Sequence, residues 1–132
     1  MYYDVNLLLD TCKFVWLAAE PQKLSETASA AIDEGKKNIL LSDVSIWEIC
    51  VKWRSGKLRL PSPPRIWIEE QRTQWRLGLL SIESKHLYGT TELEMIHQDP
   101  YDRMLVAQSI AEGMRVVSPD RNIAQYPLAV VW

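Results

Sequence analysis

Short apolar segments alternate along this chain with longer segments in which apolar residues recur every three or four positions. Short apolar runs are typical of strands that a sheet buries on both faces, and the longer period is typical of helices that bury one face. The pattern predicts strands over residues 4–9, 38–41, 79–82 and 115–117, with a candidate fifth strand over residues 128–131. It predicts helices over residues 11–19, 25–34, 45–54, 64–75, 84–93 and 100–111.

The order of these elements indicates the fold class. Strands that alternate with helices favour a parallel sheet with helices on both faces. We therefore expect an α/β fold, with one domain over residues 1–132 and a small parallel sheet of four to five strands flanked by helices. Gly35 and Gly113 follow predicted helices, and Pro64 begins one, as expected for helix ends. The length of 132 residues suits a single hydrophobic core.

Three of the predicted strands end at or shortly before an acidic residue. Asp10 follows the first strand, Asp43 and Glu48 follow the second, and Asp120 follows the fourth. The carboxyl ends of parallel strands share one edge of the sheet, where open α/β folds form their sites. Carboxylate oxygens gathered there would suit a hard cation such as Mg²⁺ or Mn²⁺.

Most of the acids also have a structural interpretation. Glu48 fits a capping box with Ser45, and Asp99, directly before a proline, is a natural N-cap. Asp102 would then lie in the first helical turn, where a negative charge is favourable, and Asp120 could cap the turn that follows it. The acid that ends the first strand has the weakest such explanation. The shared placement of the acids favours a common site.

Clustered carboxylates repel one another unless a cation neutralises them. Mg²⁺ and Mn²⁺ keep several waters and complete their shell with substrate phosphate, so an open acidic pocket suits phosphodiester hydrolysis. One ion, or two about 3.5–4 Å apart, could activate the attacking water and stabilise the leaving oxygen.

Composition excludes several classes of protein. The net charge of −2 argues against a uniformly basic nucleic-acid coat. The spacing of the cysteines and histidines, namely Cys12, Cys50, His86 and His97, matches neither a disulfide framework nor a zinc signature. No apolar run approaches the length of a membrane span, and no signal peptide is evident, so we expect a cytoplasmic protein.

Four segments then resemble one family in order and spacing. These are LLLDT at residues 7–11, VSIWEI running into GKL at 44–58, HQDPYDR with LVAQ at 97–108, and VVSPDR at 116–121. Together they resemble a PIN-domain protein, and more narrowly the VapC-type toxin of a type II toxin–antitoxin system.

The resemblance implies a magnesium-dependent endoribonuclease, usually a homodimer, that a cognate antitoxin neutralises. It carries over four metal-binding and catalytic acids, namely Asp10, Glu48, Asp102 and Asp120. Asp99 matches an additional acid of the family, which we interpret as a helix cap or a group supporting a ligand. Ser118 could orient water or a carboxylate.

RNA binding would require local basicity. The best cluster lies just after the Glu48 helix and comprises Lys52, Arg54, Lys57 and Arg59. Arg103 could contact phosphate or pair with an acid. The alternative for the cluster is an ordinary solvated face.

The chain departs from the family pattern after Asp10. Many relatives carry His where this chain has Cys12, which puts any role of that His in substrate placement in doubt. Lys13 could contact phosphate instead, although a solvated helix position is the simpler expectation.

Two other functions stay open. A receiver-type phosphoacceptor would require a second acid beside Asp10 and a lysine after the last strand, and the chain lacks that acidic neighbour. A catalytically inactive PIN-like scaffold that binds RNA or protein is the stronger alternative. The six tryptophans are expected first in the core, with some at a homodimer surface or an antitoxin groove.

Overall fold

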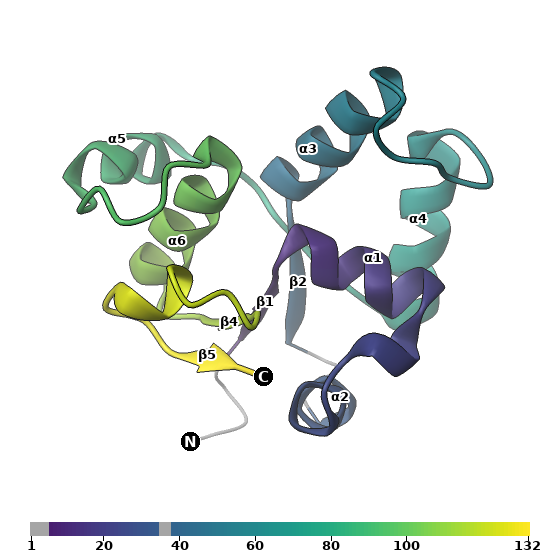
Figure 1. Cartoon of the computed structure of the whole chain (residues 1–132), viewed down its shortest axis with the longest axis horizontal. Coiled ribbons are helices and arrows are strands. Elements are labelled where there is room, and N and C mark those ends of the chain that lie inside the picture. The colour runs from purple at the N-terminus through teal and green to yellow at the C-terminus, as the bar shows by residue number, and fades with distance from the viewer. Residues whose placement is uncertain (1–5, 35–37) are drawn as a thin grey trace.

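A parallel sheet of five short strands forms the centre of the protein (Figure 1). The computed structural model describes residues 6–34 and 38–132. The strands are β1 (Leu7–Leu9), β2 (Ile39–Ser42), β3 (Gly78–Leu80), β4 (Arg115–Val117) and β5 (Val130–Val131). Their order in the sheet is β3-β2-β1-β4-β5, and each neighbouring pair is parallel. The predicted α/β fold class is confirmed.

In the described part of the chain, six α-helices connect the strands. They are α1 (Thr11–Ala19), α2 (Glu26–Glu34), α3 (Asp43–Arg54), α4 (Pro64–Trp75), α5 (Ser84–Glu92) and α6 (Pro100–Glu112). Short 3₁₀ turns η2 (Pro21–Lys23) and η3 (Ile123–Gln125) were not predicted as helices. The predicted boundaries agree within two residues, except that the first and fifth strands are shorter. Asp4, Val5 and Gly35 lie outside the described residues.

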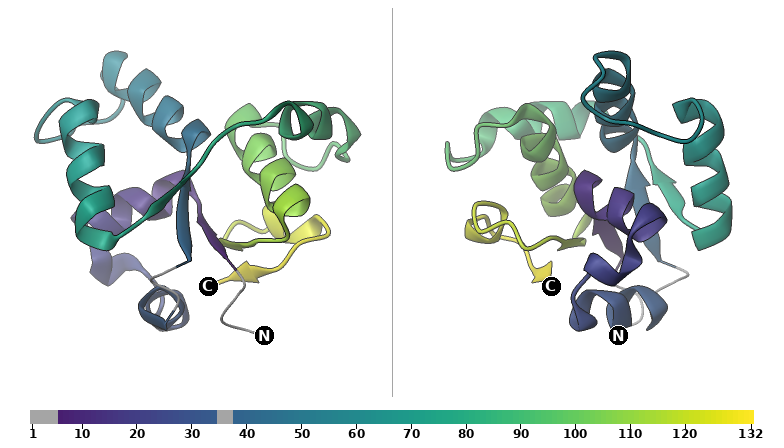
Figure 2. Two further views of the ribbon diagram at one scale, coloured as in Figure 1. Left: turned by 180° about the vertical axis from the view of Figure 1, so that it is seen from behind. Right: turned by 45° about the vertical axis from the view of Figure 1, so that its right-hand side comes forward.

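The strands bury both faces, as their continuous apolar sequences predict. Leu7 and Leu9 pack into a core with α1, α2, α3 and α4, whereas Leu8 points to the opposite face and packs with Leu105 of α6. Figures 1 and 2 show α1, α2 and α4 on one side of the sheet, with α5 and α6 on the other. No helix in the described parts of the chain is long and apolar enough to cross a bilayer.

The sheet order places a topological switch point beside β1. The chain continues from β1 to β2 on one side, and β4 pairs with β1 on the other, with Leu9 opposite Val117. Helix α3 contacts α1, α4 and α6, so it bridges the two helical layers. The segments that follow β1 and β4 therefore lie next to each other, which is where α/β folds bind ligands.

Candidate active site

A cavity of about 530 Å³ opens at this switch point. Five acids line it, namely Asp10, Glu48, Asp99, Asp102 and Asp120. They come from the ends of β1 and β4, from α3 and from the start of α6. The four acids that the sequence singled out thus lie together in space. Asp43 does not join them, because its carboxylate accepts a hydrogen bond from the backbone N–H of Ile82, at 3.4 Å.

Asp10 is held by hydrogen bonds to both carboxylate oxygens. Oδ1 accepts from the backbone N–H of Cys12 at 2.9 Å, so Asp10 caps α1, a structural role that the sequence did not indicate. Oδ2 accepts from the hydroxyl of Ser118 at 2.7 Å. The Ser118 oxygen in turn accepts from the backbone N–H of Asp120 at 3.1 Å. Ser118 therefore links the acids that follow β1 and β4.

Glu48 is buried on α3 with only one oxygen paired. Oε2 lies 2.6 Å from Lys52 Nζ, and this hydrogen bond raises the pKa of Lys52 against the effect of burial. Oε1 is buried and has no hydrogen-bond donor within residues 6–34 and 38–132. An unsatisfied buried carboxylate oxygen is unfavourable, and a cation would satisfy it.

The capping-box interpretation of Glu48 is wrong because α3 begins earlier than predicted. Ser42 is the N-cap, and its hydroxyl accepts from Val44 N–H at 3.0 Å. Ser45 is already inside the helix, where its hydroxyl oxygen accepts from Thr11 Oγ1 at 2.8 Å. Glu48 therefore has no capping role and is free to face the cavity.

His97 lies between two of the acids and was not assigned to the site from the sequence. Its Nε2 is 3.1 Å from Asp102 Oδ2 and 3.0 Å from Asp120 Oδ2. Its Nδ1 accepts from the backbone N–H of Asp99 at 3.2 Å, which leaves the ring proton on Nε2, facing both carboxylates. The sequence signal was its place at the start of the HQDPYDR segment, two residues before Asp99.

Asp99 and Asp120 also cap local structure, as their structural interpretations predicted. Asp99 Oδ1 accepts from the backbone N–H groups of Tyr101 and Asp102. Asp120 Oδ1 accepts from Asn122 N–H at 2.8 Å, and its Oδ2 faces His97. These caps fix carboxylates at the cavity and do not exclude a second role for them.

The electrostatics of the cavity indicate an excess of negative charge. Burial is the largest of the causes that together raise the pKa of Asp102 from 3.8 to about 7; the charges of Asp10, Asp99 and Glu48 also raise it, and His97 acts to lower it. Burial also acts to raise the pKa of Asp120, but hydrogen bonds from His97 and two backbone amides hold it below its usual value. A carboxylate whose charged form is disfavoured beside four other acids fits a site for a divalent cation.

The predicted basic residues differ in whether they line the cavity and in whether they pair with an acid. Lys13, Lys52 and Lys57 line it, whereas Arg54 and Arg59 are exposed and do not. Lys52 is paired with Glu48. Lys52 and Lys57 are both exposed at the cavity, but of these two only Lys57 has no ion pair among the described residues.

Arg103 has a structural role that its predicted role in RNA binding did not anticipate. Nη1 donates to the carbonyls of Glu94 and His97, at 3.0 and 3.2 Å, and Nη2 donates to that of Thr90 at 2.6 Å. The guanidinium is half-buried against the loop before α6 and does not line the cavity. We therefore withdraw Arg103 from the RNA-binding residues.

Replacing Arg103 with Met is expected to lower the free energy of unfolding by about 2–3 kcal/mol, because three backbone carbonyls lose a charged donor. Urea denaturation of the variant measures this change. Arg121→Met is the control, since the exposed Arg121 side chain has no hydrogen bond or ion pair within the described structure. If the Arg103 variant keeps its stability but binds RNA more weakly, Arg103 contacts RNA and the structural role is wrong.

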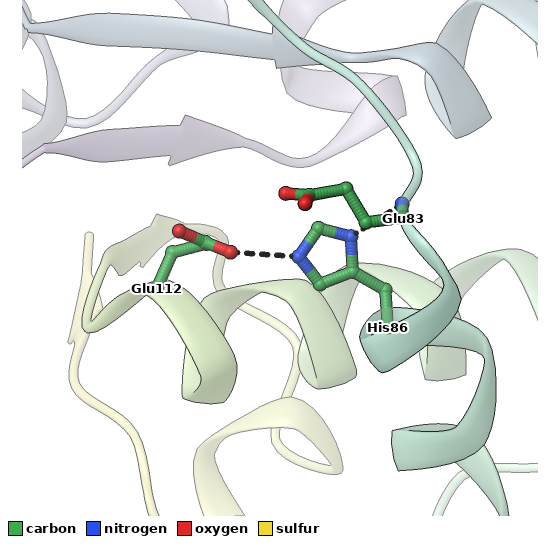
Figure 3. A group of neighbouring side chains, drawn as sticks. All are labelled: Glu83, His86 and Glu112. Carbon is green, nitrogen blue, oxygen red and sulfur yellow. Dashed lines mark hydrogen bonds and ion pairs between the residues drawn. The ribbon is translucent and has the colours of Figure 1, made fainter.

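A second group of acids and histidine lies apart from the cavity, between α5 and α6 (Figure 3). His86 is fully buried, and its Nδ1 accepts from Glu83 N–H at 3.0 Å while Nε2 donates to Glu112 at 2.8 Å. Lys85 also contacts Glu112, and the hydrogen bonds from Lys85 and His86 lower the pKa of Glu112. Both ring nitrogens are occupied by hydrogen bonds within the protein, so this group joins the two helices.

Comparisons with known proteins agree with this geometry. Residues 7–128 match the family model of the PIN domain. Ribonuclease VapC22 of Mycobacterium tuberculosis is 27% identical over 122 residues, which are 92% of this chain and 92% of the relative.

Similar folds occur in solved toxin–antitoxin structures. VapBC2 from Rickettsia felis, bound to a DNA fragment from its promoter, contains a chain with a TM-score of 0.72 and 16% identity, over 96% of this chain and 97% of the other. A toxin–antitoxin complex from Klebsiella pneumoniae gives a TM-score of 0.63 and 14% identity, over 96% and 97%. At these identities the structures establish the shared fold.

Proposed function

Because this chain belongs to the PIN-domain family, we propose that it is a metal-dependent endoribonuclease that acts as a toxin and is neutralised by a cognate antitoxin. The observation that carries the proposal is the cavity where Asp10, Glu48, Asp102 and Asp120 converge from separate elements. The ribonuclease relative and the toxin–antitoxin complexes of similar fold support the same activity and partner.

Mg²⁺ or Mn²⁺ is the cofactor that this donor set would hold. Asp10, Glu48, Asp102 and Asp120 offer only oxygen ligands, and the unpaired Oε1 of Glu48 and the raised pKa of Asp102 both favour an added cation. When bound, the ion would activate a water and stabilise charge on the scissile phosphate.

The chain's own residues would prepare the site for that chemistry. Ser118 holds the Asp10 carboxylate, and His97 holds those of Asp102 and Asp120, so three acids are fixed before substrate arrives. Such preorganisation reduces the reorganisation needed in the transition state. Lys57 would contact the RNA backbone from the exposed side of the cavity.

Partner binding is proposed for the exposed apolar side of α3. Trp47 is 59% exposed and Val51 is 41% exposed, one helical turn apart on the same face. Exposed tryptophans commonly anchor protein interfaces, so we expect this face to contact the antitoxin or a second copy of the chain in a homodimer. We propose that the toxin acts on RNA in the cytoplasm.

The full chain, purified free of antitoxin, tests the proposed activity. We expect cleavage of single-stranded RNA with Mg²⁺ or Mn²⁺ and none with EDTA. Denaturing gel electrophoresis of the RNA detects the cleavage. Cleavage should cease when a cognate antitoxin is added. A folded chain that binds metal and RNA but leaves the RNA intact would contradict the enzyme and favour an inactive scaffold.

A further inference from the structure

Lys13 is buried in the wall of the acidic cavity. It lies in the first turn of α1, three residues after Asp10, and it lines the cavity with only 7% of its surface exposed. The expectation of a solvated helix residue is therefore wrong, because α1 begins at the carboxyl edge of the sheet and its first turn faces the site. A buried lysine is uncommon unless its charge has a partner.

The partners of the Lys13 ammonium are weak. Nζ lies 3.5 Å from the ring centroid of Trp16 and 5.5 Å from that of Trp132, and these two rings pack at 6.0 Å. Within residues 6–34 and 38–132, the one hydrogen bond of Nζ is to Cys12 Sγ, at 3.7 Å. Among the residues with described positions, no carboxylate oxygen lies within 4.0 Å of Lys13 Nζ, so Nζ forms no ion pair with them. The indole faces hold the charge in place, but they leave most of its donor capacity unused.

We propose that Lys13 binds a non-bridging oxygen of an RNA phosphate in this cavity, an inference that rests on the proposed nuclease function. A phosphate oxygen would supply the charged acceptor that the structure does not give to Nζ. Because two aromatic rings already hold the ammonium, little side-chain freedom is lost when the phosphate arrives.

The other cavity lysines are less suited to this role. Lys52 already donates to Glu48 at 2.6 Å, so binding phosphate would require it to leave that carboxylate. Lys57 is exposed and must be ordered on binding. Lys13 is thus the preorganised cation of the cavity.

Substitution of Lys13 by Met tests the proposal in the full, antitoxin-free chain. RNA affinity is measured by fluorescence anisotropy with Ca²⁺ in place of Mg²⁺, with a gel to verify that the RNA stays intact. We expect binding about 10-fold to 100-fold weaker, as for loss of a charge-assisted hydrogen bond. The slope of log affinity against log salt should flatten by about 0.7, the value for one phosphate contact on a single strand. Lys13→Arg should retain most of the affinity.

Lys23→Met is the matched control. Lys23 also lies 5.5 Å from the Trp16 ring centroid, but it pairs with Glu20 at 2.5 Å and does not line the cavity. This variant should bind RNA with the wild-type affinity and salt slope. Equal losses in both variants would mean that the Trp16 environment matters and the Lys13 charge does not, which would overturn the proposal.

Titration calorimetry of Mn²⁺ binding distinguishes phosphate binding by Lys13 from a structural role of Lys13. Loss of a positive charge near the acids should leave Mn²⁺ affinity unchanged or increase it, whereas a folded variant that loses Mn²⁺ and RNA binding together would show that Lys13 shapes the acidic site, which would overturn the proposal. Lys13→Gln provides a second variant if Lys13→Met does not fold.

The Lys13 proposal and the proposed function fail in different ways. If the wild type cleaves RNA while Lys13→Met binds it unchanged, the Lys13 proposal is wrong and the nuclease remains. If the wild type neither binds nor cleaves RNA, both are wrong.

Discussion

Replacing Asp10 with Asn is expected to slow metal-dependent RNA cleavage by about 100-fold to 1000-fold, the range known for removing one group that stabilises the charge of a transition state. Asp10 contributes a buried carboxylate at the switch point, and Asn has the same shape without the charge that a divalent cation requires. The Asn side-chain oxygen can still accept from Cys12 N–H, so α1 keeps its cap. Single-turnover cleavage with saturating Mg²⁺ measures the effect.

Asp43→Asn provides the control for this experiment. Asp43 also follows a strand at the carboxyl edge, but its side chain accepts from Ile82 N–H and does not line the cavity. Its replacement should leave the cleavage rate within a factor of two or so, since no charge is removed from the site. Wild-type activity in the Asp10 variant would show that the site lies elsewhere.

The sheet and the acids at its edge were predictable because each depends on local sequence. Asp10 follows a strand of three leucines, and its position relative to the sheet is set by that strand alone. Asp120 is placed in the same way by β4. Parallel pairing then brings the two ends together without further information. The helix ends at Pro64 and Gly113 were also local signals, and the structure agrees with both.

The partners of individual side chains were not predictable, because they come from segments far apart in the chain. His97 meets Asp120 across 23 positions, and Ser118 meets Asp10 across 108. The Lys13 ammonium lies 3.5 Å from the ring of nearby Trp16 but also 5.5 Å from that of Trp132, which is far away in the sequence. Arg103 is engaged by loop carbonyls whose direction no residue pattern specifies. Sequence patterns indicate which residues approach the site, and only the fold determines their charge environment.

Replacing Asp102 with Asn is expected to abolish most cleavage and, at the same time, to stabilise the metal-free protein. The folded protein raises the pKa of Asp102 from 3.8 to about 7, mainly through burial and then through Asp10, Asp99 and Glu48. Ionised Asp102 therefore opposes folding at neutral pH, by at most about 4 kcal/mol. Because the side chain is partly exposed, we expect Asn to increase the free energy of unfolding by about 1–3 kcal/mol at pH 8 in EDTA.

The sign of this effect determines its pH dependence. A raised folded-state pKa means that the wild type loses stability as the pH rises from about 4 to about 7, so the advantage of the Asn variant should grow over this range and level off above it. Asp120→Asn should instead lower the free energy of unfolding, because the pKa of Asp120 is lowered from 3.8 and its ionised form stabilises the fold; this loss should stay nearly constant from pH 4 to 8, since Asp120 titrates below that range. Urea denaturation from pH 4 to 8 measures both variants. Saturating Mg²⁺ should raise the free energy of unfolding of the wild type more than that of Asp102→Asn, because an ion that binds the folded state adds stability. An Asn variant that is less stable than wild type at pH 8 would show that Asp102 is not held in a surplus of negative charge, and the case for a cation at this cavity would lose its electrostatic basis.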